Sequence, residues 1–484
     1  MSIERRAISA LKWATAAKVI VQIASWAGTL VVIRLLTPHD YGLMAKVSVI
    51  CSIASVVAEL GLGAAIVRSA QIVGDDLRKI YGLSLLFGLG VTAAVAATAP
   101  LLAWLFQEPL LSLPIAVAAL QIMVGVVAII PSALANRELS FRQLAKVEVA
   151  AGISGIAATL VLALLGAGVW ALVLGNLFGA VVRSAVLLAT GPRVRPLFSF
   201  GGLGEQLKFG LTVVGNRISY YVVIQSDVLI GSAFLTTTEI GQYSVALQLA
   251  TLPMSKIMGT VNEVMMPAMA RLQDDRASVR DAVMKCIGLM SLLSFPVLWG
   301  ISAVAPELVR LLFGEAWMVV VPALVILPLI GPIRMVSSLI FTTSLALGNR
   351  KLDLRNTIAN FALVPTGFFV GAHWGLIGLC SAWLVSVPLA YAFSVPAALG
   401  SIGLRAIELV KECGPPALAA GAMYAAIAAL RPLLVDAPVI VALGALCIGG
   451  GLTYVVVMWA ISRRHLVIAR SFARSFVMRD RAGK

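Results

Sequence analysis

Long apolar runs follow one another along almost the whole chain, and short segments between them carry most of the charge. A transmembrane helix needs about 20 mostly apolar residues, whereas a strand of an outer-membrane barrel needs about 10 in an alternating pattern. These runs are long and do not alternate, so they predict helices. Their spacing predicts about fourteen membrane-spanning helices, near residues 14–36, 43–67, 80–104, 113–134, 146–165, 168–190, 208–234, 240–266, 283–304, 318–347, 357–373, 375–398, 414–430 and 437–461.

The composition indicates an all-α integral membrane protein. Of the 484 residues, 60% are hydrophobic and 12% are charged, and the mean hydropathy is +0.99. Such a chain has too little polar surface to cover a soluble globule. The first apolar run is longer than the core of a signal peptide and contains polar residues, so we expect it to be retained as a helix.

Charge in the connecting segments predicts the orientation of the chain. Lys and Arg concentrate at the N-terminus and in alternate segments, near residues 68–79, 137–146, 193–208, 271–285, 350–355 and 405–411. Cytoplasmic loops of membrane proteins keep the positive charge. We therefore expect an even number of helices and both termini in the cytoplasm. This asymmetry accounts for much of the net charge of +15, so we do not expect nucleic-acid binding.

The C-terminal tail carries a separate basic pattern. Arg463, Arg470, Arg474 and Arg481 fall along one helical stripe. A basic residue near an anionic membrane surface contributes about 1 kcal/mol of binding. We expect this tail to bind anionic lipids of the inner leaflet.

Short motifs recur in the two halves of the chain. "NRELSFR" at 136–142 is followed by "NRKLDLR" at 349–355, and "LTPHDYGLM" at 36–44 by "LTTTEIGQY" at 235–243. Two six-helix repeats in the same orientation are predicted, an architecture found in transporters. The expected parts are an N-lobe of helices 1–6 (1–190), a linker (191–207), a C-lobe of helices 7–12 (208–398), an extra helix pair 13–14 (399–461) and the tail (462–484).

Polar side chains at helical spacing mark four of the predicted spans. The stripes consist of Thr15, Lys18, Gln22, Ser25 and Thr29 in span 1, Ser48, Ser52, Ser55 and Glu59 in span 2, Thr212, Asn216, Ser219 and Ser226 in span 7, and Ser244, Gln248, Thr251, Ser255 and Asn262 in span 8. Small hydroxyl residues also pack membrane helices together. That the same two helices of each half are striped favours a shared aqueous cavity over packing alone.

Charged residues inside the spans refine this hypothesis, because an ionised side chain at the bilayer centre costs about 2.5–3.5 kcal/mol on insertion scales. Lys18 and Lys46 lie near helix ends, where snorkelling to the interface explains them. Deeper charges could form internal ion pairs, for example Arg217 with Asp227 or Lys256 with Glu59. Alternatively they form a cationic interior for an anionic ligand. The binding candidates are then Lys18, Gln22, Ser25, Asn216, Arg217, Gln248, Lys256 and Arg334, with Glu59, Asp227 and Glu263 as candidate counter-charges or ion-coupling sites.

Span 10 contains several helix-breaking residues. Pro322, Pro328, Gly331 and Pro332 lie close together, and Arg334 follows them. Proline inside a membrane helix is tolerated where neighbours or water satisfy the freed carbonyl groups. The span is expected to bend, with Arg334 just after the break.

Four motifs carry a resemblance to a known family: "LTPHDYGLMA", "GQYSVALQLATLP", "LLFGEAWMVVVPAL" and "ALGNRK". The chain resembles the polysaccharide-exporting branch of the MOP superfamily, which contains the Wzx-type flippases of lipid-linked oligosaccharides. The resemblance implies two six-helix lobes in a V, alternating between inward-open and outward-open states, with helices 1, 2, 7 and 8 lining the cavity. The extra pair 13–14 departs from the twelve helices that Wzx-type members often have.

The same resemblance implies a cargo and partners. The cargo would be undecaprenyl-pyrophosphate bearing a sugar repeat unit, moved from the inner to the outer leaflet of a bacterial inner membrane for surface or exopolysaccharide biosynthesis. Lys18, Arg217, Lys256 and Arg334 would then neutralise its pyrophosphate. A polymerase and other polysaccharide-assembly proteins are the expected protein partners.

Two other classes of protein are alternatives to this one. A membrane glycosyltransferase or polymerase of the same pathway should have a large outward loop with acidic, histidine or arginine groups, and the outward loops predicted here are short. A cation-coupled multidrug antiporter of the same superfamily would share the fold but should have an acidic cavity. GxxxxGK[ST] and HExxH motifs are absent, and the five cysteines lack metal-like spacing. We therefore expect a transporter without a cofactor.

Overall fold

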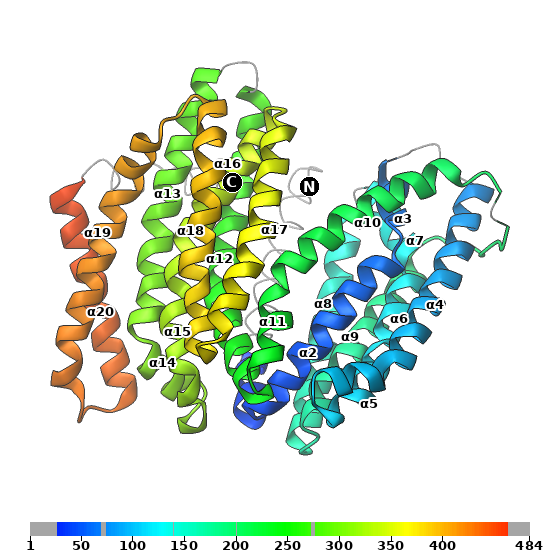
Figure 1. Cartoon of the computed structure of the whole chain (residues 1–484), viewed down its shortest axis with the longest axis horizontal. Coiled ribbons are helices and arrows are strands. Elements are labelled where there is room, and N and C mark those ends of the chain that lie inside the picture. The colour runs from blue at the N-terminus through cyan, green and yellow to red at the C-terminus, as the bar shows by residue number, and fades with distance from the viewer. Residues whose placement is uncertain (1–26, 69–73, 139, 200, 273–275, 463–484) are drawn as a thin grey trace, which may run out of the picture. The chain divides into compact units, whose positions relative to one another are not determined.

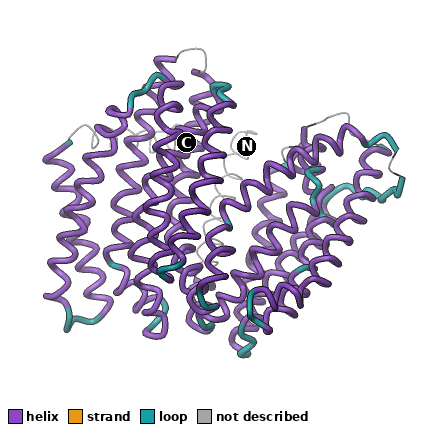
Figure 2. The backbone as a smooth tube through the Cα atoms, in the orientation of Figure 1, coloured by secondary structure: helices purple, strands orange, loops and turns teal. Residues whose placement is uncertain are grey.

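The computed structural model describes residues 27–68, 74–138, 140–199, 201–272 and 276–462. All regular secondary structure in these ranges is helical (Figure 2). The chain divides into two compact units, residues 1–241 and 242–484. The predicted all-α class is confirmed.

The first unit begins with a helical segment at residues 27–35. The helices that follow in this unit (Figure 1) are α2 (Pro38–Ala58), α3 (Leu62–Arg68), α4 (Asp75–Leu105), η1 (Pro109–Leu111), α5 (Ser112–Ala118), α6 (Leu120–Val127), α7 (Ile129–Arg137), α8 (Phe141–Leu164), α9 (Val169–Thr190), α10 (Gly204–Ile224) and α11 (Ser226–Phe234). Helix α12 (Thr237–Leu272) starts in this unit and continues into the second.

The second unit contains the C-terminal half of the chain. Its remaining helices are α13 (Arg276–Ala303), α14 (Ala305–Leu312), η2 (Glu315–Val320), α15 (Val321–Ile326), η3 (Leu327–Ile330), α16 (Gly331–Ala346), α17 (Arg350–Ala372), α18 (Gly375–Ile402), α19 (Ala406–Leu430), η4 (Arg431–Leu434) and α20 (Val439–Ile461). Helix α17 packs along α18, α13 along α19, and α19 along α20.

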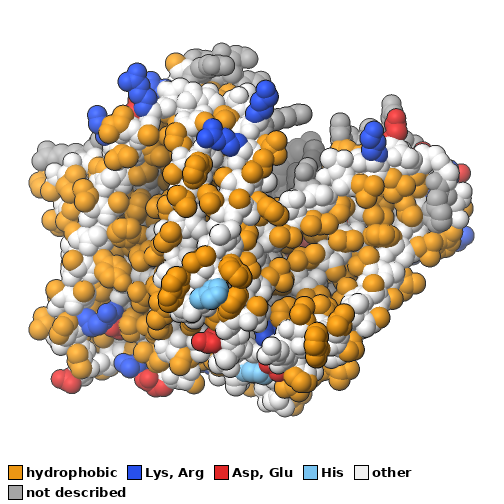
Figure 3. Space-filling view, in the orientation of Figure 1, with side chains coloured by type: hydrophobic (Ala, Val, Ile, Leu, Met, Phe, Trp, Pro, Cys, Tyr) orange, Lys and Arg blue, Asp and Glu red, His pale blue; other side chains and the backbone are white. Residues whose placement is uncertain are grey.

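Ten helical segments of the described chain are long and apolar enough to cross a membrane. On the face shown in Figure 3, apolar side chains cover the middle of the helices and most charged side chains lie near helix ends. This distribution suits helices that cross a hydrocarbon layer, because a charge at the bilayer centre is costly. The total of fourteen spans stays a prediction.

The compact units do not follow the predicted lobe boundaries. Helices α10 and α11 lie in the first unit, where α10 packs against α2 and α3, and α11 packs against α2. The boundary between the units therefore falls after Gly241. The lobes predicted from the repeat, and the repeat itself, stay predictions.

The repeated "LT" motifs adopt the same local structure in both copies. Thr37 caps α2 in a reciprocal pair with Asp40, and Thr236 pairs in the same way with Glu239 at the start of α12. Such capping boxes satisfy backbone N–H groups that a helix start leaves unpaired. The short polar side chains of the motif thus fix where each helix begins.

The two helix starts also touch through glycine. A Cβ atom added at Gly42 would overlap the carbonyl oxygen of Thr237, and one added at Gly241 would overlap that of Pro38. Only a residue without a side chain permits this approach of two backbones. The glycines in register between the two motifs therefore let the first turns of α2 and α12 pack in direct contact.

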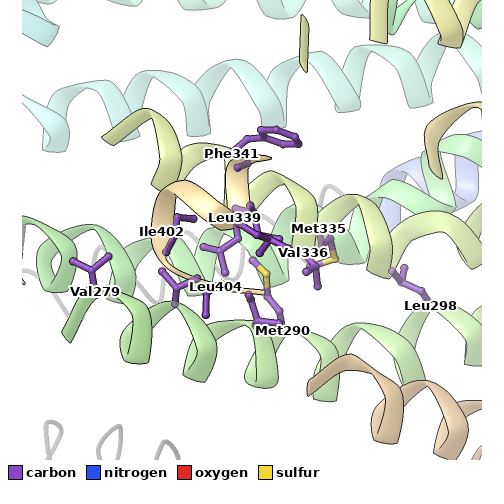
Figure 4. Close-up of a cluster of buried hydrophobic side chains, with 14 residues drawn as sticks. Val279, Met290, Leu298, Met335, Val336, Leu339, Phe341, Ile402 and Leu404 are labelled. Carbon is purple, nitrogen blue, oxygen red and sulfur yellow. The ribbon is translucent and has the colours of Figure 1, made fainter. Parts of the chain in front are cut away.

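The core of the second unit lies between α13, α16 and α18. Figure 4 shows Met290 of α13 facing Met335, Val336 and Leu339 of α16, with Leu404 beside them. Lipid tails are as apolar as this core, so burying the side chains inside a membrane gains little hydrophobic free energy. Dispersion contacts between the closely packed side chains stabilise the interface instead. The interface fixes the position of α16, which carries Arg334.

The predicted break in span 10 is confirmed. The span divides into α15, the 3₁₀ turn η3 and α16, with Pro328 inside η3 and Pro332 in the first turn of α16. Each proline removes a backbone donor and prevents a continuous α-helix. Arg334 lies in the first turns of the helix that restarts after the break.

Candidate functional site

The candidate residues fall into three groups in the structure. Lys18, Gln22 and Ser25 lie outside the described residues, and the side chains of Asn216 on α10 and Glu263 on α12 are also outside them. Arg217, Glu59 and Asp227 lie in the first unit, and Gln248, Lys256 and Arg334 in the second. The described candidates are therefore considered unit by unit.

Arg217 and Glu59 form an ion pair. The Arg217 Nη1 atom lies 2.8 Å from Glu59 Oε2 and donates a hydrogen bond to it. Arg217 thus pairs with a different carboxylate from the one suggested for it above. Both side chains are about half exposed, at 50% and 45%. An exposed pair of this kind is held weakly, about 0–1 kcal/mol, so its partners can exchange.

The backbone next to Glu59 is unusual. Helix α2 ends there, and Leu60 and Gly61 both have positive φ angles, +47° and +62°. A Cβ atom added at Gly61 would lie 2.6 Å from the carbonyl oxygen of Gly210 on α10. A left-handed leucine is strained and persists only where the surroundings impose it. The close packing of α10 against this turn positions Glu59 for Arg217.

The contact of α2 with the end of α10 and the start of α11 is more buried than the Arg217–Glu59 pair. Gln225 donates a hydrogen bond to Ser52 of the span 2 stripe, at 3.3 Å. Asp227 is 1% exposed, and its Oδ1 atom accepts a hydrogen bond from the backbone N–H of Val228 at 2.7 Å. The carboxylate therefore stabilises the start of α11 from a buried position. A residue of the span 2 stripe thus bonds to Gln225, the neighbour of Ser226 in the span 7 stripe.

A charged cluster at the other end of α2 was not predicted. Lys46 is 2% exposed, so the snorkelling expected for it is wrong. Its Nζ atom donates to Thr237 Oγ1 at 2.9 Å, and the Thr237 hydroxyl donates to Glu108 Oε2 at 2.6 Å. His39 Nε2 lies 3.5 Å from the same Glu108 oxygen, and the Phe106 ring lies 5.6 Å from Lys46 Nζ. We call these residues the Lys46 cluster.

The partners of Lys46 explain its burial. Glu108 lies in the turn after α4, and Thr237 is the first residue of α12, 191 residues along the chain from Lys46. A buried ammonium group is tolerated where it is paired and hydrogen-bonded. A lysine in the third turn of a capped apolar helix was the available signal, but its partners are too distant in sequence to be recognised.

The second unit holds a different arrangement. Gln248 and Lys256 lie on an exposed part of α12. Arg334 is half-buried on α16, and its guanidinium carbon lies 4.4 Å from the centre of the Trp383 ring on α18. This geometry is a cation–π contact. Arg334 is thus the candidate whose surroundings are most completely defined in this unit.

The chemistry of the described candidate residues is cationic. Within the described ranges, no group of three or more His, Cys, Asp or Glu residues lies close enough to hold a metal ion. Lys46, Arg217 and Arg334 instead offer hydrogen-bond donors and positive charge. Arg217 and Arg334 are the accessible ones, and both suit an anionic ligand.

The ten apolar helical segments define an all-helical, multi-pass membrane protein. The fold is similar to the lipid II flippase MurJ in an inward closed conformation, with a TM-score of 0.71 and 16% identity, over 95% of this chain and 100% of that one. It is also similar to an inward-facing multidrug resistance MATE family transporter of the MOP superfamily, with a TM-score of 0.59 and 17% identity, over 79% of this chain and 98% of that one.

Residues 31–322 match the polysaccharide biosynthesis protein family, and the chain belongs to that family. It is 27% identical over 416 residues to the lipopolysaccharide biosynthesis protein WzxC of Escherichia coli (strain K12), covering 83% of each chain. It is 25% identical over 299 residues to the succinoglycan biosynthesis transport protein ExoT of Rhizobium meliloti (strain 1021), covering 61% of this chain and 60% of that one. The resemblance inferred from the sequence motifs is confirmed.

Proposed function

We propose that the protein flips an undecaprenyl-pyrophosphate-linked oligosaccharide repeat unit from the inner to the outer leaflet of the bacterial inner membrane. The observation that carries the proposal is the similarity to WzxC over 83% of both chains. The fold shared with MurJ supports a transporter that works by alternating access. The product would be used for surface or exopolysaccharide biosynthesis.

The expected orientation places both termini in the cytoplasm. The alternating basic segments of the sequence support this orientation through the positive-inside rule. The basic tail at residues 462–484 would bind anionic lipids of the inner leaflet. A polymerase and other polysaccharide-assembly proteins would receive the flipped unit.

The accessible cations would neutralise the pyrophosphate during transport. Arg217 is half exposed and its partner Glu59 is equally accessible, so a phosphate oxygen can replace the carboxylate. Arg334 and the exposed Lys256 supply further positive charge in the second unit. The remaining proposed contacts are Lys18, Gln22, Ser25, Asn216 and Gln248, with Glu59, Asp227 and Glu263 as counter-charges or ion-coupling groups.

A cation-coupled multidrug antiporter is the second candidate, favoured by the fold similarity to a MATE family transporter. A site for cationic drugs needs accessible carboxylates without cationic partners. Glu59 is paired with Arg217, and Asp227 is buried. The arrangement of charge therefore favours an anionic cargo.

Purified protein in proteoliposomes tests the proposal, with a defined undecaprenyl-pyrophosphate-linked oligosaccharide as cargo. Arg217→Ala and Lys256→Ala should each slow flipping about tenfold or more, because a hydrogen bond to a charged group contributes about 1.5–3 kcal/mol. Arg183→Ala is the matched control, since Arg183 forms a 2.8 Å ion pair with Glu148 between α8 and α9, away from the candidate residues. Flipping is measured as the cargo becoming accessible to an externally added enzyme.

The same vesicles separate the two functions. Flipping by the wild type that Arg183→Ala retains and Arg217→Ala loses supports the proposal. Wild-type vesicles that transport ethidium but do not flip the oligosaccharide would refute it in favour of the antiporter. Equal flipping by all four proteins would refute the assignment of Arg217 and Lys256 to the cargo site.

A further inference from the structure

Arg334 differs from the other arginines on membrane helices in what balances its charge. Arg217 pairs with Glu59, Arg280 with Glu408, and Arg431 with Glu307. In the described part of the chain, no carboxylate forms an ion pair with Arg334, and its guanidinium group instead lies over the Trp383 ring. An arginine inside a membrane protein without a carboxylate partner indicates a functional position.

The aromatic partner of Arg334 is built into the core of the second unit. Trp383 is 6% exposed, and its Nε1 atom donates a 2.7 Å hydrogen bond to the hydroxyl of Tyr243, which is fully buried. Phe368 packs edge-on against the indole, with ring centres 4.9 Å apart and planes at 66°. These contacts come from α12 and α17, so the indole on α18 is held by two other helices as well as by its contact with Arg334.

The cation–π contact with Trp383 determines which N–H donors of Arg334 stay available for a ligand. The guanidinium group is planar, and its five N–H donors point outward in that plane. An indole ring attracts the positive charge but accepts none of these hydrogen bonds. Arg334 is half-buried, so part of its side chain remains accessible. This fork matches two oxygens of a phosphate group, a geometry that a lysine ammonium cannot reproduce.

The backbone explains why the stack forms here. Gly331 and Pro332 open α16 after the 3₁₀ turn η3, and Arg334 follows within the first turns. The indole of Trp299 on α13 donates to the carbonyl oxygen of Leu329 inside η3, at 3.1 Å. One of the carbonyls at the break is thereby satisfied, so the break is a fixed feature that holds Arg334 over Trp383.

We propose that Arg334 binds phosphate oxygens of the polyprenyl-pyrophosphate cargo through its in-plane N–H groups, and that Trp383 and Tyr243 are positioning residues for it. This inference rests on the proposed function and names the chemical group that the second unit recognises. It separates Arg334 from Arg217, whose charge is already neutralised by a carboxylate. Arg334 gives affinity for a phosphate without first losing a protein partner.

Binding of two probes to the full-length protein in lipid nanodiscs tests the inference. Undecaprenyl pyrophosphate carries the phosphates, and undecaprenol has the same chain without them. Arg334→Lys and Trp383→Leu should weaken undecaprenyl pyrophosphate binding about tenfold or more and leave undecaprenol binding unchanged. Trp383→Phe keeps an aromatic face and should lose less affinity than Trp383→Leu, and Tyr243→Phe should fall between wild type and Trp383→Leu.

Trp317→Phe is the matched control, because Trp317 is also a buried tryptophan of the second unit, and its ring packs against Phe313. It should bind both probes as wild type does. If Trp383→Leu weakens both probes equally, or if Arg334→Lys binds undecaprenyl pyrophosphate like wild type, the inference is wrong while the proposed function stands. If the wild type binds undecaprenyl pyrophosphate no better than undecaprenol, both fail.

Discussion

Helix α2 carries two charged clusters in opposite environments. Near its start, Lys46 is 2% exposed and is held by Thr237 and Glu108. Directly after its end, Glu59 pairs with Arg217, and both are about half exposed. The buried cluster cannot exchange partners without leaving a charge unpaired, whereas the exposed pair can. We infer that the first end of α2 is a structural anchor and the second end is a working site.

Among substitutions in the structural anchor at the start of α2, one at its glycine contact should reduce stability the most. Gly42→Ala places a methyl group on the carbonyl oxygen of Thr237, and the obstacle is backbone rather than a flexible side chain. The first turns of α2 and α12 must then separate. The free energy of unfolding should fall by at least about 3 kcal/mol, the upper range for overpacking. Thermal unfolding of the purified protein in detergent measures the change.

Gly90→Ala is the control for this substitution. Gly90 lies in the middle of α4, and a Cβ atom there would meet no other atom within 4 Å. Alanine is favoured over glycine in a helix by about 0.5–1 kcal/mol, so this variant should be as stable as wild type or slightly more stable. Equal melting temperatures for Gly42→Ala and Gly90→Ala would contradict the close contact between α2 and α12.

Removal of the positive charge of Lys46 should have the next largest effect on the free energy of unfolding. Lys46→Met preserves the length of the side chain but removes its charge and its donor to Thr237, whose hydroxyl donates to the Glu108 carboxylate. Loss of a hydrogen bond to a charged group should lower the free energy of unfolding by about 2–3 kcal/mol. The double variant Lys46→Met with Glu108→Gln should recover part of this loss, because no unpaired carboxylate remains. A double variant less stable than Lys46→Met alone would show that Glu108 does not depend on Lys46.

The contrast between the two ends also shows what a sequence pattern can specify. Apolar runs predicted the helical segments, and the prolines of span 10 predicted its break, because these are local properties of neighbouring residues. The family motifs were equally recognisable. These features together established the all-helical class and the family.

Tertiary partners could not be predicted in the same way. Lys46 lies near a helix end, where snorkelling is the usual outcome, yet its partners Thr237 and Glu108 belong to remote segments. The same limit applies to Trp383, whose indole became part of the Arg334 site only because α16 and α18 pack together. Helical periodicity shows which residues share a face but not which helix that face contacts.

Substitution of Glu59, at the working end of α2, should have the smallest effect on stability and a clear effect on transport. Glu59→Gln removes the charge that holds Arg217, but an exposed ion pair contributes about 0–1 kcal/mol, so the melting temperature should stay close to that of wild type. Arg217 then meets the pyrophosphate without a competing carboxylate, and the cargo should bind more tightly and be released more slowly. Flipping assays at several cargo concentrations should therefore show a lower half-saturating concentration together with a lower maximal rate. Glu148→Gln, which removes the partner of Arg183, should leave both kinetic values unchanged. A loss of stability as large as that of Lys46→Met, with unchanged kinetics, would mean that both ends of α2 are anchors.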